Sequence, residues 1–429
     1  MSNLNLIPIG KLFDLEKGSL QSSKCTEGEY TFITAAEEWK THNEYSHECE
    51  ALIFAAAASG SLGRTHYIND KFITSDLCFI LTPKDSKKYP INLKFYHFVF
   101  NSLKDEIVKN TKSGTSKESI NQSNLRNYKI PYFEIDKQNL WIDKLVNTKS
   151  IKEDLEFELS SGQSLLKQLK QTILQEAIEG KLTEKWRAKN PDIGTAKELL
   201  AQIKIEKEKL IKEKKLKASK PLAPINEDEI PFDIPSSWEW CRFGNIVEHN
   251  AGKTLDRGRN KGLAQKYITT SNLYWGYFIL DDLKEMLIDE SELSKCTVQK
   301  GDLLVCEGGE AGRSAVWEND ETICIQNHIH RVRPYQNINT YYLYYYLMKI
   351  FLTGEIDNYR NGMGIKNLSG KSLSTIIIPI APKEEQKEIV ATIEKLFAIC
   401  DELECEINQN KTTVDNLMAT VLKEAFEQQ

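Results

Sequence analysis

The chain contains a long-range internal repeat, and this repeat restricts its possible folds more than any other feature. The segment KSLSTIIIPIAPKEEQKEIV, at residues 371–390, has a counterpart in SNLRNYKIPYFEIDKQNLWI, at residues 123–142. A duplication of this kind indicates that the chain is built from two related structural units. Four residue pairs carry the match at one constant offset: Leu373 and Leu125, Ile378 and Ile130, Pro379 and Pro131, and Gln386 and Gln138.

The repeat extends in both directions from these segments. Residues 166–180 match residues 414–428 at the same offset, so no net insertion or deletion separates the two copies there. Upstream the match is weaker and the offset varies, so each half of the chain holds a divergent block followed by a better preserved one. The upstream pairs are Gly10 with Gly244, Gly18 with Gly252, and Gly63–Arg64 with Gly312–Arg313.

The better preserved block has the pattern of a long amphipathic helix. Apolar residues recur every three or four positions between about 384 and 426, and Glu384 and Glu385 occupy the first turn, where the helix dipole favours acids. Such a helix would be about 65 Å long, and its apolar seam would need a partner. Because the first copy carries a similar seam from Leu145 to Ile173, the two copies are predicted to pack against each other.

The two divergent blocks are predicted to be mixed α/β domains. GDLLVCEGG, ETICIQNHIHRVRP and STIIIPI have the patterns of strands, and NTYYLYYYLMKIF has the pattern of a helix whose tyrosines pack in a core. A chain of 429 residues is expected to form two to three domains. We predict a first α/β domain at 1–140, a central helical region at 141–220 with a charged helix at about 195–217, a proline-rich connector at 221–236, a second α/β domain at 237–380 and a C-terminal long helix at 381–429.

Composition argues against several classes of protein. Hydrophobic residues make up 40% and charged residues 28% of the chain, which is typical of a soluble globular protein. The longest apolar run, at 51–58, is too short to span a bilayer, and no signal peptide is visible. Nine scattered cysteines without a C-x-x-C pair indicate reduced thiols in the cytoplasm. A net charge of −6 argues against coating of nucleic acid by charge alone, but it permits local basic patches.

Two related domains joined by paired long helices would hold two surfaces at a set distance and rotation. Duplex DNA is the natural two-site ligand for such an arrangement, because half-sites one helical turn apart, about 34 Å, lie on the same face of the duplex. Domains that recognise different base sequences must differ in surface, whereas a spacer that sets a distance must not. We therefore predict a protein that binds two half-sites in DNA.

Several segments of the chain resemble the specificity subunit of type I restriction–modification enzymes. These are IPFDIPSSWEWCRFGNI at 230–246, NHIHRVRP at 327–334, LKQTILQEAIEGKL at 169–182 and IIIPIAPKEEQKEIVATIEKLFAICDEL at 376–403. The first block departs from the pattern, because LNLIPIGKLFDL lacks the Trp-Glu-Trp entry of the second. The resemblance covers nearly the whole chain. It implies an α+β fold in which two mixed α/β target recognition domains are separated by two long helices, with an antiparallel coiled coil and a pseudo-twofold internal repeat.

The resemblance also implies a function and a set of partners. The chain would be a non-catalytic specificity subunit of a methyltransferase and restriction endonuclease complex, and each target recognition domain would recognise one half of a bipartite target in double-stranded DNA. Its helices would bind two methyltransferase (modification) subunits, and restriction (motor–nuclease) subunits would complete the complex. No cofactor or metal is expected on the chain itself, since S-adenosylmethionine, ATP and Mg²⁺ would bind to the partner subunits.

Motifs for catalysis or cofactor binding are not found. NPDI at 190–193 lacks the second proline and the aromatic residue of an adenine methyltransferase loop, and AGKT at 251–254 lacks the leading glycine of a Walker motif. No G-x-G-x-x-G motif is present. His42, His47 and Cys49 lack a fourth metal ligand at suitable spacing, so surface or packing roles are predicted for them.

Two alternative functions are also compatible with parts of the sequence. The first is a coiled-coil scaffold that joins two proteins without binding DNA. The second is a stand-alone Mg²⁺-dependent nuclease that would use Asp192, Glu213 and Lys215. The nuclease is disfavoured because Glu213 falls in a lysine-rich predicted helix rather than on a strand next to Asp192.

Residues that contact DNA are expected on exposed loops with cationic, amide or hydroxyl side chains. Several segments of the second domain fit this description, and the glycines of NAGKTLDRGRNKG would allow the backbone to approach a phosphate. The candidates there are Lys253, Thr254, Arg257, Arg259, Asn260, Lys261, Arg313, Ser314, Asn327, Arg331, Arg360, Asn361, Lys366 and Asn367. In the first domain the counterpart loop is KNTKSGTSKESINQSN. The candidates in that domain are Lys112, Ser113, Thr115, Ser116, Lys117, Arg64 and Thr65.

Two patterns allow two interpretations each. On a strand through 327–331, alternate residues share a face, so the histidines and the pair Asn327 and Arg331 lie on opposite faces, and either set can be structural. The lysine-rich run 204–220 fits a helix that follows a DNA backbone and equally a solvated helix surface.

Overall fold

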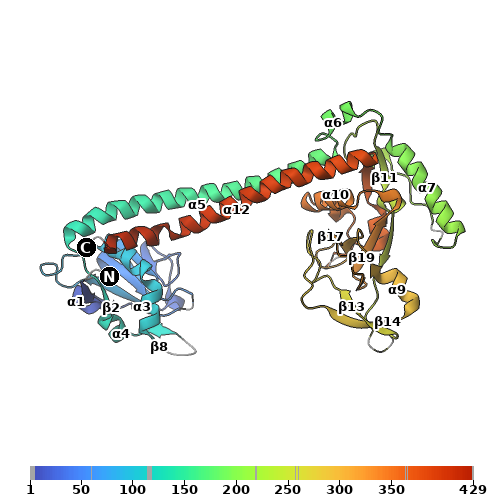
Figure 1. The fold of residues 1–429 in the computed structure, drawn as a ribbon. Helices are drawn as coiled ribbons and strands as arrows, with labels where there is room; N and C mark the ends of the chain where they lie inside the picture. The colour runs from blue at the N-terminus through green and yellow to red at the C-terminus, as the bar shows by residue number, and fades with distance from the viewer. Residues whose placement is uncertain are drawn as a thin grey trace. The chain divides into compact units, whose positions relative to one another are not determined.

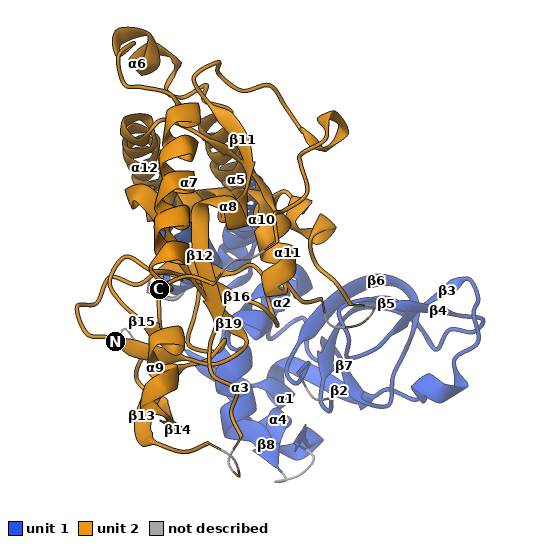
Figure 2. Cartoon of the chain, turned by 90° about the vertical axis from the view of Figure 1, so that its right-hand side faces the viewer, with its two compact units in different colours: residues 1–162, 406–429 blue, residues 163–405 orange. Residues whose placement is uncertain are grey.

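The computed structural model of the chain describes residues 5–58, 60–113, 118–217, 220–256, 258, 260–362, 364 and 366–427 (Figure 1). The chain divides into two compact units (Figure 2). Unit 1 comprises residues 1–162 and 406–429, and unit 2 comprises residues 163–405. Each unit contains an α/β domain and one part of each of two long helices. Among the described residues, no helix is both long and apolar enough to cross a membrane.

Unit 1 is built on a six-stranded sheet with the strand order β2-β7-β5-β6-β3-β4. All neighbours in it are antiparallel except β3 and β6, which are parallel. The central strand β5 is buried on both faces: Leu52 and Phe54 face the helices, while Ile53 and Ala55 belong to a second apolar cluster. The strands are β2 (Phe13–Lys17), β3 (Tyr30–Ile33), β4 (Lys40–His42), β5 (His47–Ala55), β6 (Thr65–Thr74) and β7 (Cys78–Pro83).

Unit 2 contains two four-stranded sheets, with the orders β12-β19-β16-β17 and β14-β13-β18-β15. A core that includes Ile268, Leu304 and Ile329 draws on strands of both sheets. The first sheet comprises β12 (Val247–Ala251), β16 (Leu303–Cys306), β17 (Ser314–Val316) and β19 (Ile329–Pro334). The second comprises β13 (Leu263–Ile268), β14 (Lys284–Ile288), β15 (Thr297–Val298) and β18 (Ile323–Ile325).

The first sheet of unit 2 repeats the strand order of unit 1. The order β12-β19-β16-β17 corresponds to β2-β7-β5-β6, with the same antiparallel pairing throughout. Each unit also has a separate two-stranded sheet, β1 (Leu6–Pro8) with β10 (Lys129–Pro131) in unit 1 and β11 (Glu239–Arg242) with β20 (Ile377–Ile380) in unit 2. The internal repeat predicted from the sequence is therefore present in the topology.

The repeat holds at single residues as well. Gly18 and Gly252 occupy the same tight approach, because a Cβ atom on either would lie 2.1 Å from a backbone oxygen, that of Ser75 or that of Ile325. No side chain other than hydrogen fits at such a distance. The match between these two glycines, in the weaker upstream part of the repeat, thus has a steric cause.

Short helices complete each domain in matching places. In unit 1, the N-cap of α2 is Asn92, and Tyr96 on this helix donates a hydrogen bond to the Pro131 carbonyl. In unit 2, the N-cap of α10 is Asn339, and Tyr342 donates to the Pro379 carbonyl at 2.7 Å. The helices are α1 (Ile9–Leu12), α2 (Leu93–Ser102), α3 (Lys104–Thr111) and α4 (Gln122–Asn127) in unit 1, and α6 (Glu184–Lys189), α7 (Ala196–Lys212), α8 (Phe243–Ile246), α9 (Glu290–Cys296), α10 (Thr340–Leu352) and α11 (Gly370–Thr375) in unit 2.

The tyrosine-rich helix and the charged helix were both predicted, and both are present. The side chains of Tyr342, Tyr344, Tyr345 and Tyr346 on α10 are all buried, which confirms that they pack in a core. The charged helix α7 begins after Thr195, whose side chain caps it, and it ends at Lys212, before the predicted end at about 217.

Two long helices account for the better preserved blocks, α5 at Ile135–Ile178 with 44 residues and α12 at Lys383–Glu427 with 45 residues. In unit 1 the first turns of α5 share a core with the last turns of α12, through Leu145 and Leu422. In unit 2 the end of α5 meets the first half of α12, where Lys170 pairs with Asp401 and with Glu404, both at 2.9 Å. Within each unit the two helices therefore run antiparallel, as expected.

The Trp-Glu-Trp entry of the second block has a structural explanation. Glu385, in the first turn of α12, is fully buried, and it accepts hydrogen bonds from Trp238 at 2.9 Å, Thr183 at 2.7 Å and Arg187 at 2.8 Å. These donors balance the desolvation of the carboxylate. At the corresponding position α5 has Lys137, whose ammonium group cannot accept hydrogen bonds. A tryptophan at the entry of the first block would therefore find no acceptor at this position.

Candidate nucleic-acid interface

The predicted contact segments of unit 2 lie side by side, joined by backbone hydrogen bonds. The Asn327 N–H donates to the Lys253 carbonyl at 3.0 Å, and the Glu307 N–H donates to the His328 carbonyl at 2.8 Å. The Leu368 N–H in turn donates to the Glu307 carbonyl at 2.8 Å. Segments far apart in the sequence thus form one continuous surface. We call this surface the loop row of unit 2 and define it as residues 253–262, 307–313, 326–328 and 360–369, described except for residues 257, 259, 363 and 365.

Unit 1 has a loop row built with the same bonds. The Ala56 N–H donates to the Leu77 carbonyl at 2.9 Å, and the Ile120 N–H donates to the Ala56 carbonyl at 2.7 Å. A bridge between Leu20 and Ser75 corresponds to the bridge between Lys253 and Gln326 in unit 2. The loop row of unit 1 comprises residues 19–29, 56–64, 75–77 and 112–121, described except for residues 59 and 114–117.

Most cationic candidates are held by neighbouring carboxylates. Lys366 and Arg360 both pair with Asp357, at 2.8 and 2.7 Å, while Lys253 pairs with Glu292 at 2.5 Å and Lys112 with Glu118 at 2.7 Å. Partly exposed ion pairs of this kind contribute at most about 1 kcal/mol each. The lysines can therefore exchange a carboxylate for a phosphate at little cost, and until then the carboxylates fix their positions. Arg360 is held more firmly, because its Nε also donates to the Ala311 carbonyl at 3.0 Å.

Hydroxyl and amide candidates shape the loops and line their surface. The Asn260 side chain donates to the Thr254 carbonyl at 3.2 Å, and Asn361 forms a backbone bridge with Asn367. Asn361 also donates to the Ser372 hydroxyl at 2.8 Å. The side chains of Thr254, Lys261, Asn361, Lys366 and Asn367 in unit 2, and of Lys112 and Ser113 in unit 1, are exposed.

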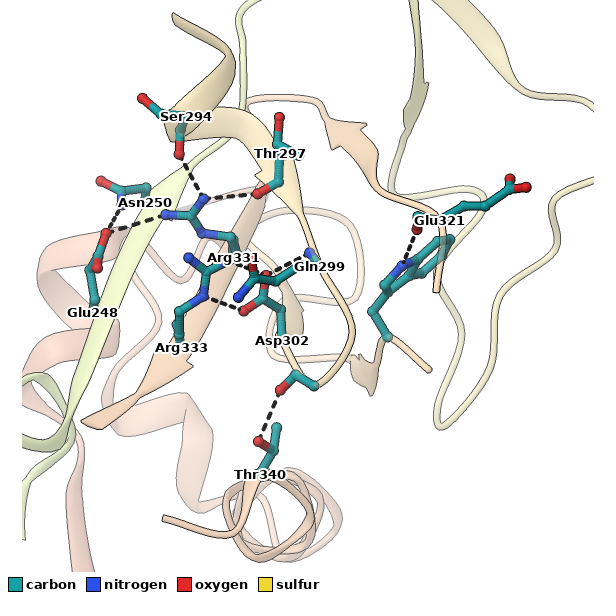
Figure 3. Close-up of polar contacts among 12 residues, drawn as sticks. Glu248, Asn250, Ser294, Thr297, Gln299, Asp302, Glu321, Arg331, Arg333 and Thr340 are labelled. Atoms are coloured by element: carbon teal, nitrogen blue, oxygen red, sulfur yellow. Dashed lines mark hydrogen bonds and ion pairs between the residues drawn. The ribbon is translucent and has the colours of Figure 1, made fainter. Parts of the chain in front are cut away.

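Three candidates lie in the interior instead of on the surface. Arg331 is on β19, which is flanked by β12 and β16, and only 2% of it is exposed. Its guanidinium donates to the carbonyls of Ser294 and Thr297, at 2.9 and 2.8 Å (Figure 3). Ser314 and Thr65, at the starts of the matching strands β17 and β6, are also buried. A buried side chain cannot reach a base or a phosphate without unfolding its strand, so these three residues have structural roles.

Arg313 and Arg64, the two arginines of the repeated Gly-Arg pair, serve as tethers. Arg313 donates to the Thr270 carbonyl at 2.6 Å, and Arg64 lies 3.5 Å from the Ala35 carbonyl. These two carbonyls occupy matching places, just after the strands β13 and β3. Each arginine therefore fastens its loop row to the end of the neighbouring strand. The two-residue Gly-Arg match in the sequence could not predict this role.

Five candidates lie outside the described residues. They are Arg257 and Arg259 in unit 2, and Thr115, Ser116 and Lys117 in unit 1.

A pocket beside the loop row of unit 2 adds residues that sequence reasoning missed. It has a volume of about 660 Å³ and lies between Leu255, Asp256 and Asn260 on one side and the strands β13 and β14 on the other. The missed residues are Thr269, Ser271 and Lys284, which line the pocket together with Gln326 of the loop row. The hydroxyl-rich run ITTSN, at the end of a strand, was the available signal for Thr269 and Ser271.

The carboxylates of the nuclease alternative do not come together. Asp192 and Glu213 flank the two ends of α7, whose 17 residues span about 25 Å. Glu213 instead pairs with Lys215 at 2.9 Å. Over the described ranges, no group of three or more histidine, cysteine or acidic side chains is placed to hold a metal ion.

The fold and the loop rows together define a duplicated chain, in which two related α/β domains each present one row of polar loops. Residues 1–160 and 235–410 match the family described as the type I restriction modification DNA specificity domain. The chain belongs to this family, and the two matched ranges contain the two α/β domains.

Relatives of known name agree with this membership. The chain is 29% identical over 254 residues to the type I restriction enzyme EcoAI specificity subunit of Escherichia coli, a match covering 57% of this chain and 42% of the relative. It is 24% identical over 426 residues to the EcoDI specificity subunit of Escherichia coli, covering 98% of this chain and 87% of the relative. The chain thus matches less than half of the EcoAI subunit but most of the EcoDI subunit.

A solved structure shares the fold. It is described as the structural basis of complex assembly and conformational transition of the type I R-M system, and it matches 99% of this chain and 98% of that chain with a TM-score of 0.70 at 14% identity. The relatives are named as specificity subunits of restriction enzymes, which agrees with the prediction that this chain is a subunit and not itself an enzyme.

Proposed function

We propose that the chain is the non-catalytic DNA-specificity subunit of a type I restriction–modification complex, which acts on DNA in the cytoplasm. Each α/β domain, at 1–140 and 237–380, would recognise one half of a bipartite target in double-stranded DNA. The observation that carries this proposal is the presence of two matching loop rows, one in each domain of a chain that belongs to the specificity family.

Within each loop row, the proposal assigns different tasks to different side chains. Lysines that pair with carboxylates, such as Lys253 and Lys366, would exchange the carboxylate for a DNA phosphate and thereby position the duplex. Amide and hydroxyl side chains, such as Asn260, Asn367 and Thr254, would form hydrogen bonds with base edges, because they can both donate and accept. The tethering arginines Arg64 and Arg313 keep the loops in place, and the buried residues take no part.

The long helices would set the unread spacer of the target and carry the partner subunits. Two methyltransferase subunits would dock at 141–220 and 381–429, the regions that contain the two long helices, and they would transfer methyl groups from S-adenosylmethionine to target bases. Motor–nuclease subunits would complete the restriction complex. ATP and Mg²⁺ would bind on these partners, which agrees with the lack of catalytic motifs in this chain.

Domain exchange tests the proposal directly. Residues 237–380 are replaced by the matching range of a family member with a different target, and methylated sites are mapped genome-wide in a host that expresses the complex. One half of the methylated motif should change while the other half and the spacer stay the same. Exchange of 1–140 is the reciprocal control and should change the opposite half. Loss of both halves, or an unchanged motif, would contradict the proposal.

The scaffold alternative makes a different prediction. A scaffold that never contacts DNA would cause no retardation in gel-shift assays, with or without the methyltransferase. The proposed subunit should retard duplex DNA once the methyltransferase is present.

A further inference from the structure

The two domains differ at one place where the repeat predicts likeness, namely the segment that follows β13 in unit 2 and β3 in unit 1. In unit 2 this segment places Trp275 against α10. The indole centroid lies 4.9 Å from the ring of Phe351 and 6.2 Å from the ring of Tyr344. An aromatic side chain of the chain itself thus covers this part of the helix.

In unit 1 the matching place is open. The N-caps Asn92 and Asn339 align α2 with α10, so His97 corresponds to Tyr344. Trp39, which follows β3, contacts His66 at a ring distance of 5.6 Å instead of covering His97. A pocket of about 330 Å³ remains, and its lining includes Trp39, His66, His97, Phe98, Val146 and Lys149. We call it the α2 pocket.

The α2 pocket combines an apolar body with positive charge. Trp39 is 41% exposed and Val146 is 52% exposed, which is unusual for large apolar side chains that line a hollow. Lys94 and Lys149 belong to the same lining, which contains no acidic residue, although Lys149 also lies 3.7 Å from Glu153.

We propose that the α2 pocket docks an aromatic side chain from a segment of a partner subunit that carries carboxylates beside that aromatic residue. The second domain shows which occupant suits this surface, because its own Trp275 fills the matching place. The lysines select acidic neighbours by charge complementarity. This inference rests on the proposed function in one respect, since it requires that partner subunits bind the chain.

The asymmetry between the domains has a consequence for assembly. Because unit 2 provides its own tryptophan, the docking site exists once per chain rather than twice. Two copies of a methyltransferase would then not be equivalent in this contact, and one of them would occupy it.

Photo-crosslinking in the assembled complex tests the inference. Val146 is replaced by p-benzoylphenylalanine in the full chain, the complex with its partner subunits is irradiated, and the captured peptide is identified by mass spectrometry. We expect one partner peptide per chain, with an aromatic residue next to aspartate or glutamate. The control places the same residue at Leu140, which is 61% exposed on the same helix but outside the pocket. Absence of a captured peptide, capture of this chain or of a second copy, or the same peptide at both positions would overturn the inference.

An affinity measurement gives an independent readout. The double variant Val146→Glu, Lys149→Glu should bind the partner subunits about tenfold more weakly. Glutamate at position 146 removes an apolar contact with the aromatic residue, and glutamate at position 149 repels the carboxylates beside it. Lys87→Glu makes the same charge change as Lys149→Glu, at an exposed lysine outside the pocket, and should leave the affinity unchanged. If the wild-type chain assembles normally and the double variant binds equally well, the inference is wrong while the proposed function stands. If the wild-type chain binds no partner subunit, both are wrong.

Discussion

The side-chain oxygen of Gln386 lies 3.0 Å from the backbone nitrogen of Asn339 and accepts its hydrogen bond. Its amide group donates to the Ala381 carbonyl at 2.8 Å, so this one side chain fastens the start of α12 to the start of α10. Gln138 repeats the arrangement in unit 1, where it accepts from the Asn92 N–H at 2.6 Å. Both glutamines are fully buried. The most exact match of the sequence repeat is thus a structural joint between each α/β domain and its long helix.

Replacement of this joint should destabilise one domain. Gln386→Leu keeps the side-chain volume but leaves the Asn339 N–H and the Ala381 carbonyl without partners, so the free energy of unfolding should fall by about 2 to 4 kcal/mol. Urea unfolding followed by tryptophan fluorescence measures the change. Gln163→Leu, at an exposed position on α5, is the matched control and should change stability by less than about 0.5 kcal/mol. Equal effects of the two substitutions would contradict the assignment of Gln386.

Much of the architecture could be predicted because it depends on patterns that recur along the chain. The long helices have an apolar seam over more than ten turns, and no strand produces such a pattern. The strand β20 and the helix α10 followed from an apolar run and from helical spacing. The pairing of the two copies followed from the need to bury both seams.

The candidate site could be predicted only in part, because exposure and pairing depend on residues distant in sequence. Arg331 and Lys366 are both cations in polar surroundings, yet the strands β12 and β16 bury the first and leave the second on a loop. The open α2 pocket was equally hidden. It arises because Trp39 contacts His66, a pairing between separate strand ends that no local pattern discloses.

Two glycines should respond in opposite directions to replacement by alanine. At Gly252 the added Cβ would lie 2.1 Å from the Ile325 carbonyl oxygen, so Gly252→Ala should force the backbone apart and destabilise unit 2 by about 3 kcal/mol. At Gly162, in the middle of α5, the nearest atom would be the Ile407 Cδ1 at 3.6 Å, an ordinary contact. Gly162→Ala should therefore stabilise the helix by about 0.5 to 1 kcal/mol. Thermal and urea unfolding of both variants check the two signs, and a stabilising Gly252→Ala would refute the steric assignment.

Buried histidines should make unit 2 sensitive to mild acid. Burial, and to a lesser extent the charge of the neighbouring His330, lowers the pKa of His249 from 6.5 to about 4. Between these two pH values the unfolded chain binds a proton that the folded chain does not, so stability is complete above pH about 6.5 and declines as the pH falls toward 4. The contribution of this one group is at most about 3 kcal/mol.

The pH dependence is measured as a difference between variants, because carboxylates titrate in the same range. The stability advantage of the wild type over His249→Gln should shrink steadily between pH 7 and pH 4.5. Ser374→Ala removes the hydroxyl 2.6 Å from the His249 Nε2 but keeps the titrating ring, so its deficit should stay nearly constant with pH. If the stability deficit of His249→Gln relative to the wild type stays constant with pH, proton uptake by His249 does not contribute to the pH dependence of stability.

A buried arginine and an exposed lysine should separate stability from DNA binding. Arg331→Met leaves the Ser294 and Thr297 carbonyls and the partly buried Glu248 without their cation, so it should destabilise unit 2 by about 3 to 5 kcal/mol. Lys366→Ala, at a side chain that is 55% exposed, should change stability by less than about 0.5 kcal/mol. It should nevertheless weaken DNA binding severalfold and reduce the slope of log affinity against log salt by about one, as expected for one lost phosphate contact.

Lys300→Ala provides the matched control for the lysine. Its side chain is also 55% exposed and pairs with Asp320 at 2.9 Å, much as Lys366 pairs with Asp357, but Lys300 lies outside the loop row. Fluorescence anisotropy with a labelled duplex containing the mapped target, titrated at several salt concentrations in the presence of the methyltransferase, should show a reduced salt slope for Lys366→Ala and an unchanged one for Lys300→Ala. If Lys366→Ala and Lys300→Ala give the same salt slope, Lys366 makes no phosphate contact that Lys300 lacks, and it does not belong to the interface.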